Sequence, residues 1–218
     1  MKIKAEKDLI KHVINTYRDA RRTKFANNKI FRGRSHSISS IIEDLFAHYL
    51  TQNIECDQIY IDQPLKIEGI KGRNIYPDLV IIKDDKIIAL LDLKMDLGWK
   101  RRELFNLAKK YSNLIKNIRN KKVSLKIGET KERRDFKVSN KITYDIVIIS
   151  DTNINKELLE KQLKQIEKLK PKIDVFILTK GKHPNSYNLP IQSLLSQIIV
   201  NKADFDRMFR KLKAKKYF

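Results

Sequence analysis

The chain has 218 residues, of which 41% are hydrophobic, while glycine and proline contribute only 6 and 5 residues. This composition excludes a disordered or collagen-like chain and predicts one globular domain over residues 1–218. No apolar run approaches the roughly 20 residues that span a bilayer, and charged residues interrupt every turn of the first segment. We therefore expect a soluble, cytoplasmic protein without membrane contact. The single cysteine, Cys56, can form neither an intramolecular disulfide nor a cysteine-based zinc site.

Positive charge is the strongest compositional signal. Lysine and arginine number 47 against 26 aspartates and glutamates, which gives a formal net charge of +21. Most of the excess lies in three segments, with 11 basic and 3 acidic residues in 1–34, 10 and 3 in 116–141, and 7 and 2 in 202–218. A surplus of this size predicts a polyanionic partner. The alternative is a lysine-rich coding bias that only produces solvated surfaces.

The first half of the chain predicts two helices followed by three strands. Apolar residues at helical spacing predict an amphipathic helix over 5–20. A second helix is expected over 39–51, with Ser39 or Ser40 as N-cap and Glu43 as the capping-box partner of Ser40. Three β-like runs follow, at 59–67, 75–83 and 86–94.

The second half predicts a helix and then a strand–helix–strand unit. A helix is expected over 99–118, and the basic segment 119–141 is either a short hairpin or an extended loop. Strands at 144–150 and 175–179, with a helix at 155–170 between them, predict a parallel pair joined by a crossover. The chain then continues through a turn-rich loop at 181–190 and helical patterns at 191–200 and 204–216.

Two aspartates fall on neighbouring strands of a predicted hairpin. The pair Asp84-Asp85 separates two apolar runs and predicts a tight turn. A turn centred there places Asp78 opposite about Leu91, one position away from Asp92. A bulge or register shift would then bring the two carboxylates onto one face. Both lie in apolar runs, where an unpaired charge is costly, so a compensating partner is expected.

A divalent metal ion is the compensating partner that these residue types favour. Carboxylate oxygens from Asp78 and Asp92 suit Mg²⁺, with Mn²⁺ as a substitute. Lys94 shares the strand face of Asp92, where its ammonium group can contact a scissile phosphate or help to activate water. Glu43 can add a third carboxylate or act only as a helix cap. The alternative for Asp78 is a turn-capping role, and for Asp92 with Lys94 an edge-strand ion pair.

These residues resemble the PD-(D/E)XK nuclease superfamily, which has the restriction-endonuclease-like fold. The match consists of Pro77-Asp78, thirteen further residues, and Asp92-Leu93-Lys94, preceded by a helix that carries Glu43. The resemblance covers about residues 38–179. It implies an α/β/α core with a central mixed five-stranded sheet, extended by a basic middle loop. It also implies N-terminal (1–37) and C-terminal (180–218) additions for DNA binding or dimerisation.

The resemblance also implies roles for the individual residues. Asp78 and Asp92 would bind Mg²⁺, Lys94 would position or activate water, and Glu43 would complete the metal site. A histidine-based metal site is not expected, because the four histidines show no ligand spacing.

DNA contacts are expected from the loops beside the site. Lysines and arginines would neutralise phosphates, and asparagines and arginines can pair with base edges; solvated loops are the alternative. The candidate residues are Arg32, Arg34, Lys121, Lys122, Arg133, Arg134, Lys182, His183, Asn185 and Asn188, with Asn27 and Asn28 in the first basic loop.

A stand-alone nuclease of this size is most similar to a Type II restriction endonuclease that cuts double-stranded DNA. Such an enzyme is expected to act as a homodimer, with the terminal amphipathic helices as dimer surfaces, and to accompany a methyltransferase that it does not contact. Two alternatives remain open. One is a repair or recombination nuclease of the same fold, such as a Holliday-junction resolvase or a transposon end-cutting subunit. The other is a basic DNA-binding module without catalytic activity.

Overall fold

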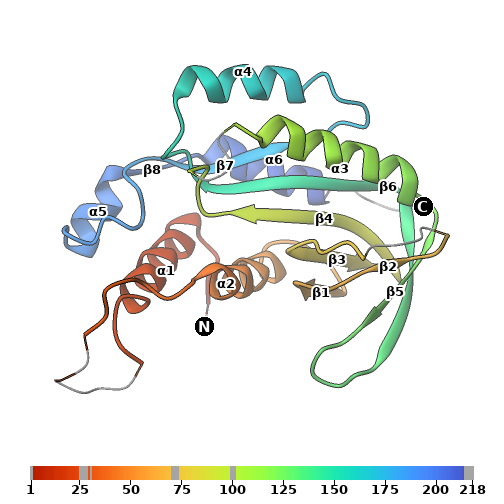
Figure 1. Ribbon diagram of the computed structural model, residues 1–218, viewed down its shortest axis with the longest axis horizontal. Helices are drawn as coiled ribbons and strands as arrows, with labels where there is room; N and C mark the ends of the chain where they lie inside the picture. The colour runs from red at the N-terminus through yellow and green to blue at the C-terminus, as the bar shows by residue number, and fades with distance from the viewer. Residues whose placement is uncertain (1, 25–28, 30, 70–73, 99–101, 214–218) are drawn as a thin grey trace.

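Periodic apolar residues form six helices and eight strands in the part of the chain that the computed structural model describes, residues 2–24, 29, 31–69, 74–98 and 102–213 (Figure 1). The helices are α1 (Glu6–Asp19), α2 (Ser39–Thr51), α3 (Leu104–Ile118), α4 (Lys156–Ile166), α5 (Ile191–Gln197) and α6 (Lys202–Lys213). The strands are β1 (Gln58–Ile61), β2 (Lys66–Ile67), β3 (Leu79–Lys83), β4 (Lys86–Lys94), β5 (Lys122–Lys126), β6 (Arg133–Ser150), β7 (Val175–Gly181) and β8 (Ile198–Val200).

The strands form one mixed, curled sheet. The main path runs β1-β3-β4-β6-β5-β2, and β7 pairs with the other end of β6 and with β8. Strands β4, β6 and β7 are parallel, whereas β1, β3 and β4 form an antiparallel meander. The α/β class is confirmed, as is the crossover through α4 between the parallel strands β6 and β7. The sheet has eight strands in the described chain rather than the five expected.

The predicted strand over 59–67 is wrong as a single element. β1 ends at Ile61 because Asp62 adopts a φ of 45° and Pro64, which has no amide proton to donate, follows closely. The chain then turns away, and β2 pairs with β5 at the opposite end of the sheet path. A local break thus sends two halves of one apolar run to different edges.

Several predicted boundaries also need correction. Helix α2 has the predicted bounds, but its N-cap is Ile38 and no side chain caps it, so the predicted capping box of Ser40 and Glu43 does not form. The predicted helix over 191–200 ends at Gln197, because the next residues extend as β8 and pair with β7. Helix α3 begins at Leu104, and residues 99–101 of the prediction lie outside the described residues.

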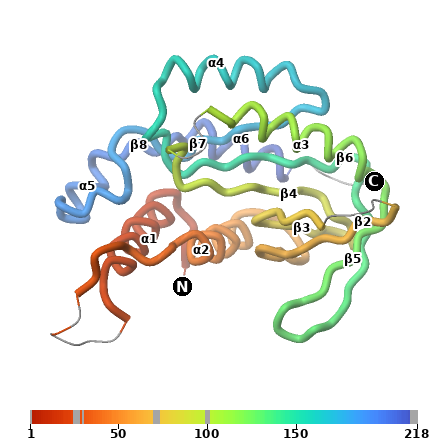
Figure 2. The backbone as a smooth tube through the Cα atoms, viewed as in Figure 1, coloured from red at the N-terminus to blue at the C-terminus, as the bar shows by residue number. Residues whose placement is uncertain are grey.

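Two apolar layers sandwich the sheet. Helices α1 and α2 pack on one face and α3 and α4 on the other, which Figures 1 and 2 show below and above the strands. Helix α6 joins the layer of α1 and α2, where the Phe205 ring lies 6.0 Å from that of Tyr49. The strands between the layers are nearly continuous runs of buried aliphatic side chains, as expected of strands covered on both faces.

The terminal helices are part of this packing. Leu9 and Val13 of α1, and Phe205 and Met208 of α6, are completely buried within the chain. The apolar faces of these helices are therefore covered within the chain. That the terminal helices form dimer surfaces stays a prediction, and such surfaces would use the outward faces of the helices.

The middle basic segment, 119–141, is a hairpin rather than a loop. Strand β5 pairs with the first part of β6 from Lys122↔Lys137 to Lys126↔Arg133. Val123, Leu125 and Phe136 are buried on one face, so alternation leaves most of the charged residues on the other, although Arg134 lies opposite Leu125. Strand β6 consequently begins eleven positions before the predicted start at 144.

No described helix is both long enough and apolar enough to cross a membrane.

Candidate active site

Asp78, Asp92 and Lys94 converge where β3 begins and β4 ends. The turn residues Asp84 and Asp85 have φ values of 50° and 55°, the left-handed backbone conformation that both central residues of a type I′ hairpin turn require. Next to the turn the register pairs Ile82 with Ile87, as predicted.

A bulge at Ile88 then changes the register by one position. Beyond it Ile81 pairs with Ala89, and Leu79 pairs with Leu91. By the same register Asp78, which directly precedes Leu79, falls opposite Asp92 rather than Leu91. The sequence suggested such a shift as one option, and the structure contains it.

The three side chains form a compact charged group. The Lys94 Nζ atom lies 2.9 Å from both carboxylate oxygens of Asp92 and 3.8 Å from Oδ2 of Asp78. Oδ2 of Asp78 accepts a hydrogen bond from the Leu93 amide at 2.5 Å, which fixes the carboxylate against β4. The side chains of Asp78, Asp92 and Lys94 are 20%, 7% and 27% exposed, so the group is sheltered but reachable from solvent.

Negative charge is concentrated at this point. Burial raises the pKa of Asp78 above its ordinary value, and the charge of Asp92 adds to the effect, while the Leu93 amide and Lys94 oppose it. Burial also raises the pKa of Glu43 to about 7, with contributions from the charges of Asp78 and then Asp62. Glu43 thus belongs electrostatically to the same group, and it is free to do so because the capping box does not form.

The sequence alone does not distinguish Asp62 from a surface charge, but its position in the fold does. Its backbone amide donates to the Asp78 carbonyl at 2.8 Å, and its charge raises the pKa of both Glu43 and Asp78. The sequence does mark Asp62, as an aspartate two residues before a proline at the end of an apolar run. Its proximity to Asp78 depends on the β1–β3 pairing, which the sequence does not specify residue by residue.

Two buried tyrosines lie behind Asp92 and were missed. Tyr111 of α3 stacks on Tyr144 of β6, with ring centroids 3.8 Å apart and planes inclined by 11°. Burial raises the pKa of both hydroxyls; Tyr144 and then Asp92 add to the effect on Tyr111, and Asp92 adds to the effect on Tyr144, so both stay protonated. At the level of sequence Tyr111 is indistinguishable from the other members of an apolar helical stripe.

The carboxylates fit a hard divalent cation in donor type but do not form a complete cage. Oδ2 of Asp92 is buried and has no hydrogen bond of normal geometry within the described chain, although Lys94 lies beside it. Aspartate oxygens of this kind suit Mg²⁺, which binds through one or two carboxylates and keeps several waters. No group of three His, Cys, Asp or Glu side chains is close enough to share one metal ion among the described residues. Asp78 and Asp92 are the residues that could hold it, with Glu43 as an outer partner.

The predicted DNA-contact loop 181–190 is anchored to the body of the protein. His183 bridges Asp96 and the Asn185 amide, at 3.1 and 2.8 Å. Its Nδ1 atom accepts from that amide, so Nε2 carries the proton and donates to Asp96, and this hydrogen bond lowers the pKa of Asp96. Arg21 of the segment after α1 donates to Asn185 at 3.0 Å.

Both ring nitrogens of His183 and the Oδ1 atom of Asn185 are thus already used inside the chain, whereas Lys182 and Asn188 are exposed. Arg21 also lies over the exposed Tyr187 ring, 3.5 Å from its centroid. These contacts hold loop 181–190 near Lys94, because Asp96, which His183 contacts, is only two residues after Lys94.

The other candidate DNA contacts are spread over two regions. Arg32 and Arg34 are exposed beyond α1, while Asn27 and Asn28 lie outside the described residues. In the β5–β6 hairpin, Arg133 is exposed but Arg134 is held by Glu132 at 2.9 Å. Lys122 is exposed and Lys121 partly so.

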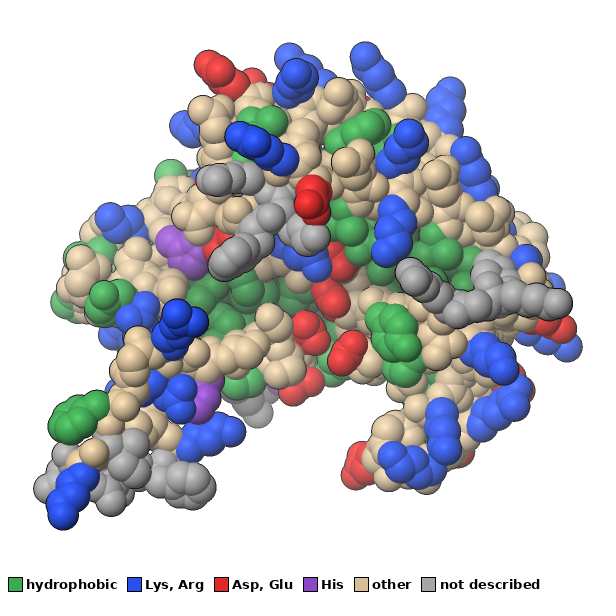
Figure 3. Space-filling view, in the orientation of Figure 1, with side chains coloured by type: hydrophobic (Ala, Val, Ile, Leu, Met, Phe, Trp, Pro, Cys, Tyr) green, Lys and Arg blue, Asp and Glu red, His purple; other side chains and the backbone are tan. Residues whose placement is uncertain are grey.

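The space-filling view shows acidic side chains gathered in a hollow at the middle of one face, with lysines and arginines around it (Figure 3). The β5–β6 hairpin projects at one side of this hollow and the segment after α1 at the other (Figures 1 and 3). The charge pattern is therefore a negative centre within a positive periphery.

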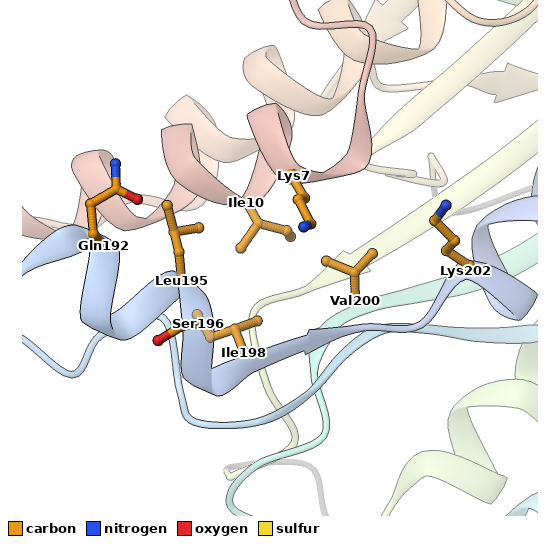
Figure 4. A pocket seen from close by; sticks show the side chains of 8 residues that line it. All are labelled: Lys7, Ile10, Gln192, Leu195, Ser196, Ile198, Val200 and Lys202. Carbon is orange, nitrogen blue, oxygen red and sulfur yellow. The ribbon is translucent and has the colours of Figure 1, made fainter.

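A separate hollow of about 500 Å³ lies between α1, α5 and β8 (Figure 4). Its walls are apolar, from Ile10, Leu195, Ile198 and Val200, with Lys7 and Lys202 at the rim. None of the described residues that line it carries a carboxylate, so it lacks the chemistry of the acidic centre.

No family model, curated protein or solved structure matches this chain. The resemblance to PD-(D/E)XK nucleases therefore depends on the motif residues and their arrangement alone.

Proposed function

We propose that the protein is a Mg²⁺-dependent endonuclease that hydrolyses phosphodiester bonds of double-stranded DNA. The observation that carries this proposal is the convergence of Asp78, Asp92 and Lys94 at the ends of two paired strands. Two adjacent carboxylates and an ammonium group, sheltered within a strongly basic protein, match the needs of phosphate hydrolysis next to a polyanion.

The side chains have separate roles in this proposal. Lys94 can donate to a non-bridging oxygen of the scissile phosphate or orient the attacking water. Glu43, whose pKa is about 7, can accept a proton from that water near neutral pH. The Leu93 amide keeps Asp78 in place, and the stacked pair of Tyr111 and Tyr144 closes the rear of the site.

Asp78 and Asp92 would hold Mg²⁺, which when bound supplies Lewis-acid stabilisation of the phosphate charge. Burial and then repulsion from Asp92 raise the pKa of Asp78, and a bound cation would relieve the repulsion. Mn²⁺ satisfies the same ligand preferences.

Within this function we favour a sequence-specific Type II restriction endonuclease that acts as a homodimer in the cytoplasm. The support is the anchored loop 181–190 and the basic projections that flank the acidic hollow, which could reach DNA on two sides. The layered α/β core, with its meander and parallel crossover, is consistent with the restriction-endonuclease-like fold.

The decisive experiment incubates the protein with unmethylated phage or plasmid DNA and Mg²⁺ and reads the products on a gel. We expect discrete bands that disappear in excess chelator. Asp92→Asn should lower the cleavage rate by at least about a hundredfold and leave DNA binding intact, because asparagine keeps the shape of the aspartate side chain but not its charge. The control is Asp85→Asn, in the exposed turn of the same hairpin, where asparagine tolerates the observed φ.

Each other outcome rejects part of the proposal. A smear of products would reject a sequence-specific restriction enzyme and favour a repair-type nuclease of the same fold. Retarded but intact DNA would indicate a binding module, and cleavage that persists in chelator would exclude the metal mechanism.

A further inference from the structure

A hollow beside the candidate active site has the chemistry of an anion site. It has a volume of about 460 Å³ and lies between β2, the segment that leads to β3, and the β5–β6 hairpin. Among the described residues, four cationic side chains and no carboxylate line it, namely Lys66, Lys126, Lys131 and Arg133. Pro64 and Leu125 also line it, and Ser124 and Asn74 add neutral polar groups.

Strand alternation produces this concentration of charge. Lys66 pairs with Ser124 across β2 and β5, and Lys126 pairs with Arg133 across β5 and β6. Directly opposite residues share a face, so these side chains point to the same side while Val123 and Leu125 point into the core. The buried face therefore fixes the outward face, which carries these cations and also Asp135, opposite Ser124.

The cations of the hollow are poorly neutralised. In the described chain, no ion pair involves Lys66, Lys126 or Lys131, and Arg133 has only a long, exposed contact of 3.4 Å with Asp135. Arg133 also donates to Ser124 at 2.9 Å, which orients the guanidinium. Like charges brought together in this way repel one another, and an anion in the hollow would relieve the repulsion.

The hollow is tied directly to the acidic centre. Asn74 precedes Asp78 by four residues, and four residues span at most about 14 Å. On the other wall, Pro64 follows Asp62 by two residues, and the Asp62 amide is bonded to the Asp78 carbonyl at 2.8 Å. Leu65 and Ile75 exchange two backbone hydrogen bonds, which hold both walls together.

We propose that this hollow binds a backbone phosphate of the DNA, within about four nucleotides of the bond that is cut, since successive phosphates of one strand rise by about 3.4 Å. This inference rests on the proposed nuclease function and deepens it. The hollow fixes where the duplex lies relative to Asp78 and Asp92, and it reads no bases.

The test measures DNA binding in chelator, where metal-dependent cleavage cannot occur. The variant pair Lys66→Gln with Lys126→Gln is compared with Lys161→Gln with Lys164→Gln, which removes the same charge from exposed positions on α4. Fluorescence anisotropy with a labelled duplex gives the affinity across a salt series. We expect the hollow pair to lose about tenfold in affinity at 0.1 M salt and to lower the salt slope by between about 1 and 2, with little change in the control pair. Equal losses in both pairs, or none in either, would overturn the proposal.

Two further measurements locate the contact and identify the ligand. Single neutral methylphosphonates, placed in turn along the strand, should weaken wild-type binding at one or two positions within about four nucleotides of the cut and should have no effect there in the hollow pair. Weakening only at more distant positions would contradict the placement. Equilibrium dialysis with inorganic phosphate should show only weak binding, and tight binding of the free ion would assign the hollow to free phosphate instead. If no DNA is cut but the hollow pair alone loses affinity, the nuclease function fails while the phosphate site stands.

Discussion

Four carboxylates, those of Glu43, Asp62, Asp78 and Asp92, act on one another where β4 ends, and Lys94 carries the opposing charge. Removing one partner of a sheltered ion pair leaves the other uncompensated, which is more harmful than replacing both. The site therefore depends on Lys94 for stability as well as for chemistry.

We expect Lys94→Met to lower the free energy of unfolding by about 2 kcal/mol at pH 8, and by less at pH 5, where protonation relieves the repulsion. Urea unfolding at the two pH values measures this change. DNA cleavage should be lost in the same variant while its far-UV circular dichroism stays native. Unchanged turnover would discard the catalytic assignment of Lys94.

Glu43 gives a pH-dependent prediction. Its pKa of about 7 in the folded chain lies above the ordinary value, so the unfolded state loses this proton at lower pH than the folded state. The free energy of folding that protonated Glu43 contributes is fully present below about pH 4.5 and is lost as the pH rises toward about 7. In metal-free buffer we expect Glu43→Gln to match wild type at pH 5 and to exceed it by about 1 kcal/mol at pH 8, after allowance for solvent screening. Thermal unfolding at both pH values tests this, and the same difference at pH 5 and 8 would reject the shared acidic site.

At the scale of elements, α6 is fixed to the sheet by an ionic network as well as by apolar packing. Lys211 lies 2.7 Å from Asp145, which is completely buried, and 2.5 Å from Asp174, while Arg207 contacts Asp174 at 3.1 Å. Burial alone would raise the pKa of Asp174, but Lys211, followed by Lys172, outweighs it and holds the pKa below its ordinary value. The basic C-terminal segment thus includes residues that serve the fold and are not free to meet DNA.

Lys211→Met should consequently destabilise the protein by about 3 kcal/mol at pH 7, because it leaves Asp145 buried without its cation. The lowered pKa of Asp174 means that its stabilising interaction is present above about pH 4 and is lost as pH falls further. The deficit of the variant should therefore shrink in acid, as measured by urea unfolding between pH 7 and 3. Lys213→Met, on the exposed side of the same helix, is the control and should change stability by less than about 0.5 kcal/mol.

At the scale of the whole molecule, a basic periphery surrounds an acidic centre (Figure 3). The periphery would attract a polyanion over a long range, while the carboxylates would admit its phosphates only with a cation. The formal charge of +21 alone does not separate this arrangement from a uniformly basic surface.

DNA affinity should therefore depend steeply on salt. With about six phosphate contacts, the association constant should fall by roughly a thousandfold between 50 and 200 mM monovalent salt. Anisotropy with an unlabelled competitor duplex checks this. A flat salt dependence would mean that the net charge reflects coding bias and not a nucleic-acid partner.

The sequence by itself determined the helices and strands whose periodicity is long, such as α2 and β4, because burial of one face leaves a regular apolar pattern. It also placed Asp78, Asp92 and Lys94 on one hairpin, because turn chemistry at Asp84-Asp85 is local. Only the tertiary structure decided the register at Ile88, which aligns the two aspartates, since a bulge follows from how β4 packs against β6 as well as β3. Pairing between distant segments likewise decided three further features: the split of 59–67, the links of Asp62 to Asp78, and the cationic hollow. No local sequence pattern encodes such pairing.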